Sequence, residues 1–330
     1  MTEYLNDLIR QRKRGWAPAY AMQSTLNWAK ALSFEISQEH SPIGTEQLES
    51  LQILFSDAVS PRNLSNVHLG DVFEPLFQAL TLSVSLTSFE SRDVTQPWTY
   101  PMAVVDWYYA NYFAFRSMVA AYDSSPAETH AKLHKIVTMG GLGAQLPHPL
   151  NMVATWQQHE DYLPVLPSYP QADPYNIVRR FEPSREVAQG MLLLYLKGTA
   201  GYLVGDLKDR VGSQEGFKDF RTKKAREVRD AWIKNQLARV GFLHCAFRYR
   251  GKSNYRDATF LTYGDMDSRF DGSFVWNLAH TARFAFMCAL TYVERRIGRS
   301  QTRDFLRDAR ENVRGLELMN SDEAFWIDLI

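Results

Sequence analysis

Two long stretches of the sequence repeat apolar residues every three or four positions, and this spacing commits them to helices that bury one face. The first, 102–122, follows Pro101, which the first turn of a helix tolerates. Its repeat runs through Val105, Tyr108 or Tyr109, Tyr112, Phe115 or Arg116, and Val119. The second, 273–297, follows the breaker Asp271-Gly272 and carries Phe274, Leu278, Ala282, Ala285, Ala289 and Val293 on one stripe. Both are predicted to be core helices.

Further helices are predicted at 185–204, 217–239 and 302–316, where the apolar spacing is again helical. Residues 81–89 alternate as in a strand, but the helical spacing before them continues to Val84, so both states stay open there. Residues 140–184 hold seven of the fourteen prolines and should form an irregular connection. The predicted fold class is therefore all-α.

The composition is typical of a globular protein that stays inside the cell. A chain of 330 residues, 45% of them apolar, can bury one large core or two ordinary ones. Cys245 and Cys288 are the only cysteines, and both are expected to be reduced, buried thiols. No apolar stretch follows the basic N-terminus, and the longest one, 191–205, is shorter than the roughly 20 residues that span a bilayer. We expect a cytoplasmic protein without a transmembrane helix or a membrane partner.

Charge is unevenly distributed in this chain, although the formal net charge is zero. Residues 35–100 hold nine acidic and two basic residues, whereas 221–256 hold eleven basic and two acidic residues. The second segment should attract a polyanion. Solvated helix faces that pair with the acidic N-terminal region are the alternative interpretation.

Arg239 and His244 are the candidate catalytic residues. Histidine can move a proton from a ribose 2′-hydroxyl near neutral pH, and a guanidinium can hold the phosphate and offset the charge of the transition state. Such cleavage of RNA requires no metal. Five residues of a regular helix turn through about 500°, however, so the two side chains would share no helix face. A core histidine and a surface arginine are the alternative.

Candidate RNA-binding residues follow in 247–257, where cations alternate with aromatic side chains. Cations can hold phosphates, and aromatic faces can stack on bases. The candidates are Arg248, Arg250, Lys252, Asn254, Tyr255 and Arg256. A structural loop whose arginines cap helix ends or pair with Asp257 is the alternative.

Two other motifs carry less weight. His130 and His134 have the i, i+4 spacing of zinc ligands, but nothing completes a metal site, and we interpret this segment as a helix start capped by Thr129. The glycines at 140–143 lack the Lys-Ser/Thr of a phosphate-binding loop. We expect neither a metal nor a cofactor.

Three segments together resemble the HEPN superfamily. Residues 108–118 (YYANYFAFRSM) resemble the family's YYAxFxAxRAL-type helix, and Thr129-His130 resembles the Thr-His that opens its next helix. Residues 250–257 (RGKSNYRD) resemble its Arg-x-x-Ala-x-Tyr-Asp stretch, which a long final helix follows, as 273–297 does here. Asn254 stands where the family usually has alanine, and Val240 where it usually has a polar residue.

The resemblance covers about 101–138 and 237–297 and implies an up-and-down bundle of four or five helices that dimerises. The predicted parts are a helical N-terminal region at 1–100 and a HEPN-like core made of 101–150 and 237–316. Residues 151–236 are then an insertion with an irregular Pro-rich connection and a basic helix. Family members that cut RNA carry an Arg-x4–6-His motif, which maps onto Arg239 and His244.

The first functional hypothesis is therefore a metal-independent endoribonuclease of a toxin or antiviral defence system. It would act as a homodimer, leave 2′,3′-cyclic phosphate ends, and have RNA and a regulatory protein as further partners. The second hypothesis is a non-catalytic HEPN-like module that binds RNA, a nucleotide or a protein, and the third is a structural helical subunit. A polar cleft shared by Arg239 and His244 favours the first, whereas a buried His244 packed on Phe242 or Phe247 favours the others.

Overall fold

The fold is built almost entirely from helices. The computed structural model describes residues 18–37, 41–63, 65, 67–90, 99–123, 127–157, 161–165, 181–212, 222–253 and 273–313. These residues form eleven helices and three short strands. The predicted helical fold class is confirmed, and one small sheet is added to it.

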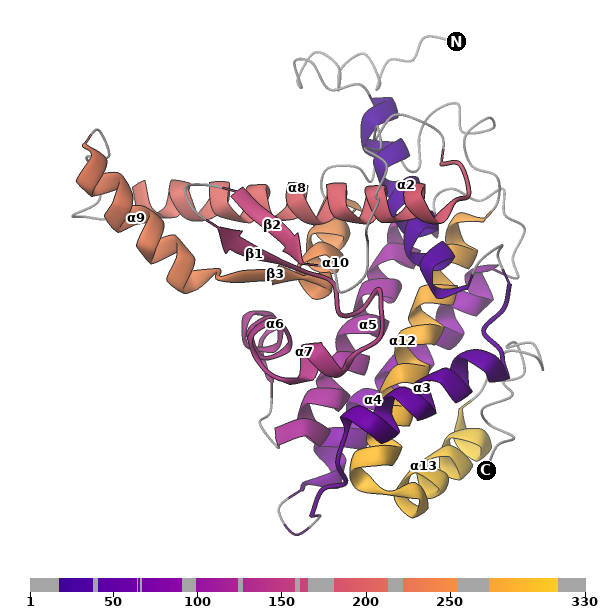
Figure 1. Cartoon of the computed structure of the whole chain (residues 1–330). Helices are drawn as coiled ribbons and strands as arrows, with labels where there is room; N and C mark the ends of the chain where they lie inside the picture. The colour runs from indigo at the N-terminus through magenta and orange to yellow at the C-terminus, as the bar shows by residue number, and fades with distance from the viewer. Residues whose placement is uncertain are drawn as a thin grey trace, which may run out of the picture.

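Three long helices that pack against one another form the centre of the fold (Figure 1). They are α4 (Leu69–Glu90), α5 (Tyr100–Asp123) and α12 (Phe274–Ile297). Twenty of the 24 residues of α12 are buried, which is the property of a helix enclosed on all sides. The core helices predicted at 102–122 and 273–297 are confirmed.

The N-terminal part of the chain is helical and packs onto this centre. It comprises α2 (Pro18–Ile36), α3 (Thr45–Ala58) and α4, and both α2 and α3 contact α12. Residues 81–89 belong to α4. There the hydroxyl of Thr87 donates to the carbonyl oxygen of Ser83 at 3.0 Å, a contact that helical spacing provides. The sequence alternation at 81–89 therefore does not indicate a strand.

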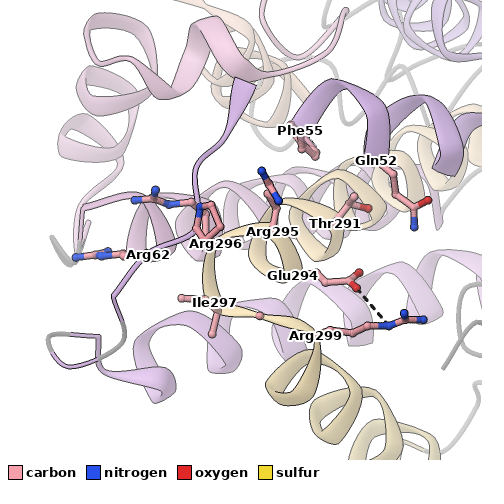
Figure 2. Close-up of a pocket in the computed structure, with 11 residues that line it drawn as sticks. Gln52, Phe55, Arg62, Thr291, Glu294, Arg295, Arg296, Ile297 and Arg299 are labelled. Carbon is pink, nitrogen blue, oxygen red and sulfur yellow. Dashed lines mark ion pairs between the residues drawn. The ribbon is translucent and has the colours of Figure 1, made fainter. Parts of the chain in front are cut away.

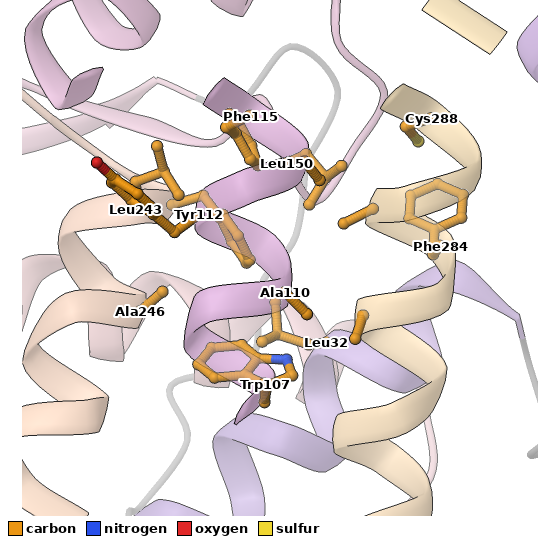
Figure 3. Packing of buried hydrophobic residues seen from close by; sticks show 14 of the residues in the cluster. Leu32, Trp107, Ala110, Tyr112, Phe115, Leu150, Leu243, Ala246, Phe284 and Cys288 are labelled. Atoms are coloured by element: carbon orange, nitrogen blue, oxygen red, sulfur yellow. The ribbon is translucent and has the colours of Figure 1, made fainter. Parts of the chain in front are cut away.

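One hydrophobic core joins the segments that the sequence analysis assigned to separate regions. Trp28 of α2 meets Trp107 of α5 edge-on, with ring centroids 5.4 Å apart, and stacks on Tyr195 at 4.5 Å. Tyr195 belongs to α8 (Arg185–Gly212), inside the predicted insertion. Figure 3 shows α5 residues such as Trp107 and Phe115 between α10 (Phe242–Gly251) and α12. The N-terminal region and the insertion thus bury apolar surface in common with the helices of the HEPN resemblance.

A hairpin of α8 and α9 (Lys223–Gln236) projects sideways from the bundle, and a three-stranded sheet lies along α8 (Figure 1). The strands are antiparallel in the order β2-β1-β3, with bounds β1 (Val153–Gln157), β2 (Asp161–Val165) and β3 (Arg239–Gly241). The prediction of an irregular connection over 140–184 is therefore wrong for β1, β2 and the short helix α7 (Leu142–Gln145). Pro164 argued against a strand in the sequence, but β2 is an edge strand, where proline is tolerated.

The helix predicted at 185–204 is confirmed as part of α8, and the one predicted at 302–316 is confirmed as far as Asn312. The helix predicted at 217–239 is confirmed over α9 and is wrong at Arg239, which lies in β3. Helix α6 (His130–Met139) begins after Thr129, whose hydroxyl accepts from the backbone N–H of Lys132 at 3.3 Å. Helix α13 (Arg299–Asn312) follows Gly298 and packs on α12. Cys245 and Cys288 are free and buried. Within the described ranges, no helix has the length and apolar character that crossing a membrane requires.

Candidate functional site

Arg239 and His244 line one cavity of about 300 Å³ where α6, β3 and α10 meet. The same cavity is lined by His130 and His134 of α6 and by the partly exposed ring of Phe247. Arg239 lies in β3 and His244 in the first turn of α10, so the two residues do not belong to one helix. The chain changes from strand to helix between them, and this change brings both side chains to the same cavity. On one continuous helix, the two side chains would point to different faces.

Gly241 makes the sharp passage from β3 into α10. A Cβ atom at this position would lie 2.8 Å from Cγ2 of Thr138 and 3.2 Å from the carbonyl oxygen of Met152, so the close packing favours glycine. The N–H of Gly241 donates to Nδ1 of His244 at 3.2 Å, which is half of a capping box. Because Nδ1 accepts this hydrogen bond, the proton of the neutral imidazole lies on Nε2.

His244 packs against a second histidine, with the two rings tilted by 55°. The ring centroids of His134 and His244 are 4.5 Å apart, and His134 is only 6% exposed. Burial lowers the pKa of His244 to about 4. Burial also lowers the pKa of His134 well below its usual range, with smaller contributions from His244 and His130. At neutral pH both rings are therefore uncharged, and protonating one disfavours protonating the other.

His130 lines the cavity and also contacts Tyr108, which lies in a cluster with Tyr109 and Arg250. Its Nδ1 lies 2.6 Å from the hydroxyl of Tyr108, and burial followed by the Arg250 charge lowers the His130 pKa. Arg250 donates from Nη1 to the hydroxyl of Tyr109 at 2.7 Å and lies 5.0 Å above the Tyr108 ring. The segments that carry the family resemblance, far apart in the sequence, are thus in direct contact here.

Arg239 is exposed at the edge of the cavity. Its Nη1 donates to the carbonyl oxygen of Thr138, near the C-terminal end of α6, at 3.2 Å. A guanidinium has five N–H donors, and this is the one hydrogen bond of the Arg239 side chain within the described residues. The side chain is therefore oriented by α6 while most of its donors face the solvent.

The other predicted RNA-binding residues make contacts inside the protein. Arg248 donates to Oγ1 of Thr199 at 3.2 Å and lies 5.5 Å above the ring of Tyr195. Lys252 is buried, with its ammonium 5.6 Å from the same ring. Arg248 and Lys252 therefore attach α10 to α8, and Arg250 attaches it to α5. Asn254, Tyr255 and Arg256 lie outside the described residues.

Apart from Arg239, the exposed cations of the predicted basic segment lie on α9 within the described residues. Lys223, Lys224, Arg226 and Lys234 are exposed, whereas the partly buried Arg229 pairs with Asp230 at 2.8 Å. The end of α9 at 235–236 and the connection 237–238 line the cavity that holds Arg239 and His244. Helix α9, which carries these exposed cations, is part of the projecting hairpin (Figure 1), and its C-terminal end reaches the candidate site.

His134 is the site residue that the sequence analysis did not connect with His244. Its signal was the i, i+4 pair with His130, which was weighed only as a metal site. Within the described residues, no group of three or more His, Cys, Asp or Glu side chains is placed to hold a metal ion. Three histidines and an arginine around one cavity can instead exchange protons and hold an anion.

The chain has no significant match to a family model, to a curated protein or to a solved structure. The geometry of the cavity and the sequence resemblance are therefore the two supports for a functional proposal.

Proposed function

We propose that this protein is an RNA-directed, HEPN-like, metal-independent endoribonuclease of a toxin or antiviral defence system. The observation that carries the proposal is the shared cavity, which brings Arg239 and His244 together beside the exposed cations of α9. The family resemblance supplies the reaction type. RNA is the proposed substrate because its phosphates suit the basic surface and its 2′-hydroxyl can serve as the nucleophile.

In the proposed reaction, the ribose 2′-oxygen attacks the adjacent phosphorus and the bond from phosphorus to the 5′-oxygen breaks. The 2′-hydroxyl loses a proton, the 5′-oxygen gains one, and the products are a 2′,3′-cyclic phosphate and a 5′-hydroxyl. Arg239 would hold the non-bridging phosphate oxygens, because its side chain is exposed and only one of its N–H groups is bonded to Thr138. This contact offsets the negative charge that develops in the transition state.

Two histidines can divide the two proton transfers. His244 would be the donor, because Nδ1 is occupied by the Gly241 N–H and Nε2 carries the proton. A bound phosphate would raise the His244 pKa and so favour the charged, proton-donating ring. His130 would be the acceptor in the tautomer in which its Nδ1–H donates to Tyr108 and Nε2 is unprotonated. His134 would position His244 through the contact between their rings.

The direct test is incubation of the purified protein with total RNA in the presence of EDTA. We expect cleavage that survives chelation and products with 2′,3′-cyclic phosphate ends, which are detected by their resistance to 3′-end labelling until the cyclic phosphate is opened and the phosphate is removed. Cleavage that needs added divalent metal, or that leaves 5′-phosphates, would contradict the proposed mechanism.

A homodimer is part of the proposal, because the family resemblance implies a site built from two facing copies and two-fold dimers are the commonest oligomers. Light scattering at micromolar concentration should give about twice the mass of the 38.0 kDa chain. A fully active monomer would exclude this part of the proposal and leave the cavity of a single chain as the site.

A non-catalytic RNA-binding module is the second candidate function. It is favoured by the intramolecular contacts of Arg248, Arg250 and Lys252 and by the burial of His134. In this case RNA would bind through α9, with an affinity that falls as salt rises, and would stay intact under all conditions.

A further inference from the structure

A second cavity, of about 490 Å³, lies at the C-terminal end of α12 (Figure 2). It shares no lining residue with the histidine cavity. Four guanidinium groups and one carboxylate are among its lining residues, which include Arg62, Glu294, Arg295, Arg296 and Arg299. Nothing in the proposed ribonuclease mechanism uses this cavity, so its chemistry requires its own explanation.

Backbone carbonyls hold three of these arginines in place, and Arg62 donates from Nη1 to the carbonyl oxygens of Ala120 and Ala121 at 3.3 and 3.0 Å. Nε, Nη1 and Nη2 of Arg296 donate to the carbonyl oxygens of Ala121, Ser60 and Tyr122 at 3.3, 2.7 and 2.7 Å. Arg295 donates from Nε to the carbonyl oxygen of Val59 at 2.8 Å. These oxygens lie at or just beyond the C-terminal ends of α3 and α5, where carbonyls lack helical partners. Carbonyls orient the guanidinium groups, but they carry no formal charge to neutralise them.

The carboxylate of Glu294 is a weak counter-charge for Arg299. Its Oε1 lies 3.8 Å from Nε of Arg299, beyond hydrogen-bonding distance; Figure 2 marks this pair. The Arg299 side chain is 69% exposed, which weakens the pair further. A concave surface with excess charge of one sign concentrates the field and attracts the opposite sign. The fixed guanidinium groups of this cavity are therefore preorganised for an anion.

The cavity is larger and less polar than an inorganic anion needs. Phe55, Pro61 and Ile297 contribute apolar atoms to its wall, and Gln52 contributes an amide. Sites for small organic molecules have volumes of about 300–1,000 Å³ and combine apolar walls with a few polar groups. Guanidinium groups match the oxygens of phosphate in a two-pronged geometry, which a single ammonium cannot do.

We propose that this cavity binds a phosphorylated small molecule of the size of a nucleoside monophosphate. Its phosphate would contact Arg295 and Arg299, and its organic part would lie against Pro61 and Ile297. The inference goes beyond the proposed RNA cleavage and does not depend on it. It gives the protein a second site, for a small molecule, at the C-terminal end of α12.

The test is isothermal titration of the full chain with AMP, with adenosine and inorganic phosphate as partial ligands. We expect AMP to bind and to weaken as salt rises, adenosine not to bind, and phosphate to bind more weakly than AMP. AMP that shows no binding at millimolar concentration overturns the proposal. Phosphate that binds as tightly as AMP overturns the part that concerns the organic group.

Two variants with opposite expected effects make the test specific. Arg299→Gln should weaken AMP binding about tenfold, because it removes a charged hydrogen-bond donor. Glu294→Gln should tighten binding, because it removes the carboxylate beside the site. Arg303→Gln, an exposed position of α13 that does not line the cavity, is the matched control and should leave binding unchanged. Equal effects of Arg299→Gln and Arg303→Gln on AMP binding would mean that AMP is attracted by surface charge in general. This result would overturn the proposed site.

Discussion

The hydroxyl of Tyr108 lies 2.6 Å from Nδ1 of His130, and this contact connects α5 to the first residue of α6. Burial raises the pKa of Tyr108, so its phenol stays protonated over the whole neutral range. The phenol can therefore donate to His130 or accept from it, and which of the two occurs decides whether Nε2 of His130 is free to take a proton. Tyr108 thus sets the chemistry of a cavity residue without lining the cavity itself.

The Tyr108→Phe variant should separate the effect of the Tyr108 hydroxyl on stability from its effect on RNA cleavage. Loss of the hydroxyl removes one hydrogen bond, so the free energy of unfolding should fall by about 1 kcal/mol. RNA cleavage should fall by more than this stability loss explains, because the His130 tautomer is no longer fixed. Tyr112→Phe is the matched control, since the Tyr112 ring lies 4.5 Å from the His130 ring. Urea unfolding and single-turnover cleavage of both variants provide the measurements, and equal cleavage rates would contradict a role for Tyr108.

RNA binding is predicted to depend on the exposed cations of α9. Changing Lys223, Lys224 and Arg226 to Glu should weaken binding strongly and reduce the slope of affinity against salt, because fewer counterions are released. The same three changes at Arg303, Arg307 and Arg310 of α13 keep the change in net charge equal and should have a much smaller effect. Fluorescence anisotropy at several salt concentrations measures both. If both triple variants lose affinity equally, α9 is not the binding surface.

A helix could be predicted from the sequence where the spacing of apolar residues within that one segment is enough to identify it. The apolar repeats of α5 and α12 were sufficient to predict the helices, because spacing within the segment identifies them, but burial of α12 on all sides does not follow from one apolar stripe. The sheet could not be predicted in this way. Its strands have three to five residues, and β3 pairs with β1 across more than 80 positions of the chain, so no local pattern reveals the pairing.

The candidate site was predictable only in part. The spacing of Arg239 and His244 indicated the pair, but their meeting at one cavity depends on the passage from β3 into α10, which a helical wheel excludes. The role of Arg250 was not predictable either. A cation that contacts RNA and one that lies over aromatic rings look the same in a sequence, and Tyr109, its partner, is 141 positions away.

Stability should fall when the pH is lowered through the histidine range. The pKa of His244 is about 4 in the folded chain and about 6.5 in the unfolded chain. Between these values the unfolded state binds more protons, so the free energy of unfolding rises with pH across this window. On acidification from pH 7 to pH 4, His244 should cost at most about 3 kcal/mol, with a further loss in the same direction from His134.

Urea unfolding at pH 7, 5.5 and 4 measures this loss. The His244→Gln variant should lose less stability over the same range, because glutamine does not titrate. An identical pH dependence in the variant and the natural chain would show that His244 is not held uncharged by the fold.

Substitutions at His244 should separate its role in the fold from its role in catalysis. Glutamine is the residue that a capping box places three positions after the N-cap, so His244→Gln can still accept from the Gly241 N–H. It cannot transfer a proton. We therefore expect a melting temperature close to that of the natural chain and a cleavage rate lower by about 10²–10⁴. His244→Ala should lose the same activity and, in addition, about 1 kcal/mol of stability with the lost cap.

Arg239→Ala completes this comparison, because the arginine is exposed and its removal should hardly change stability. Its loss should slow cleavage by a similar factor, since it removes the charge that faces the phosphate. Near-normal cleavage in His244→Gln or in Arg239→Ala cannot be reconciled with the roles proposed for them. If neither the natural chain nor any variant cuts RNA while RNA still binds through α9, the two residues have structural roles, with His244 capping α10 and Arg239 binding the end of α6.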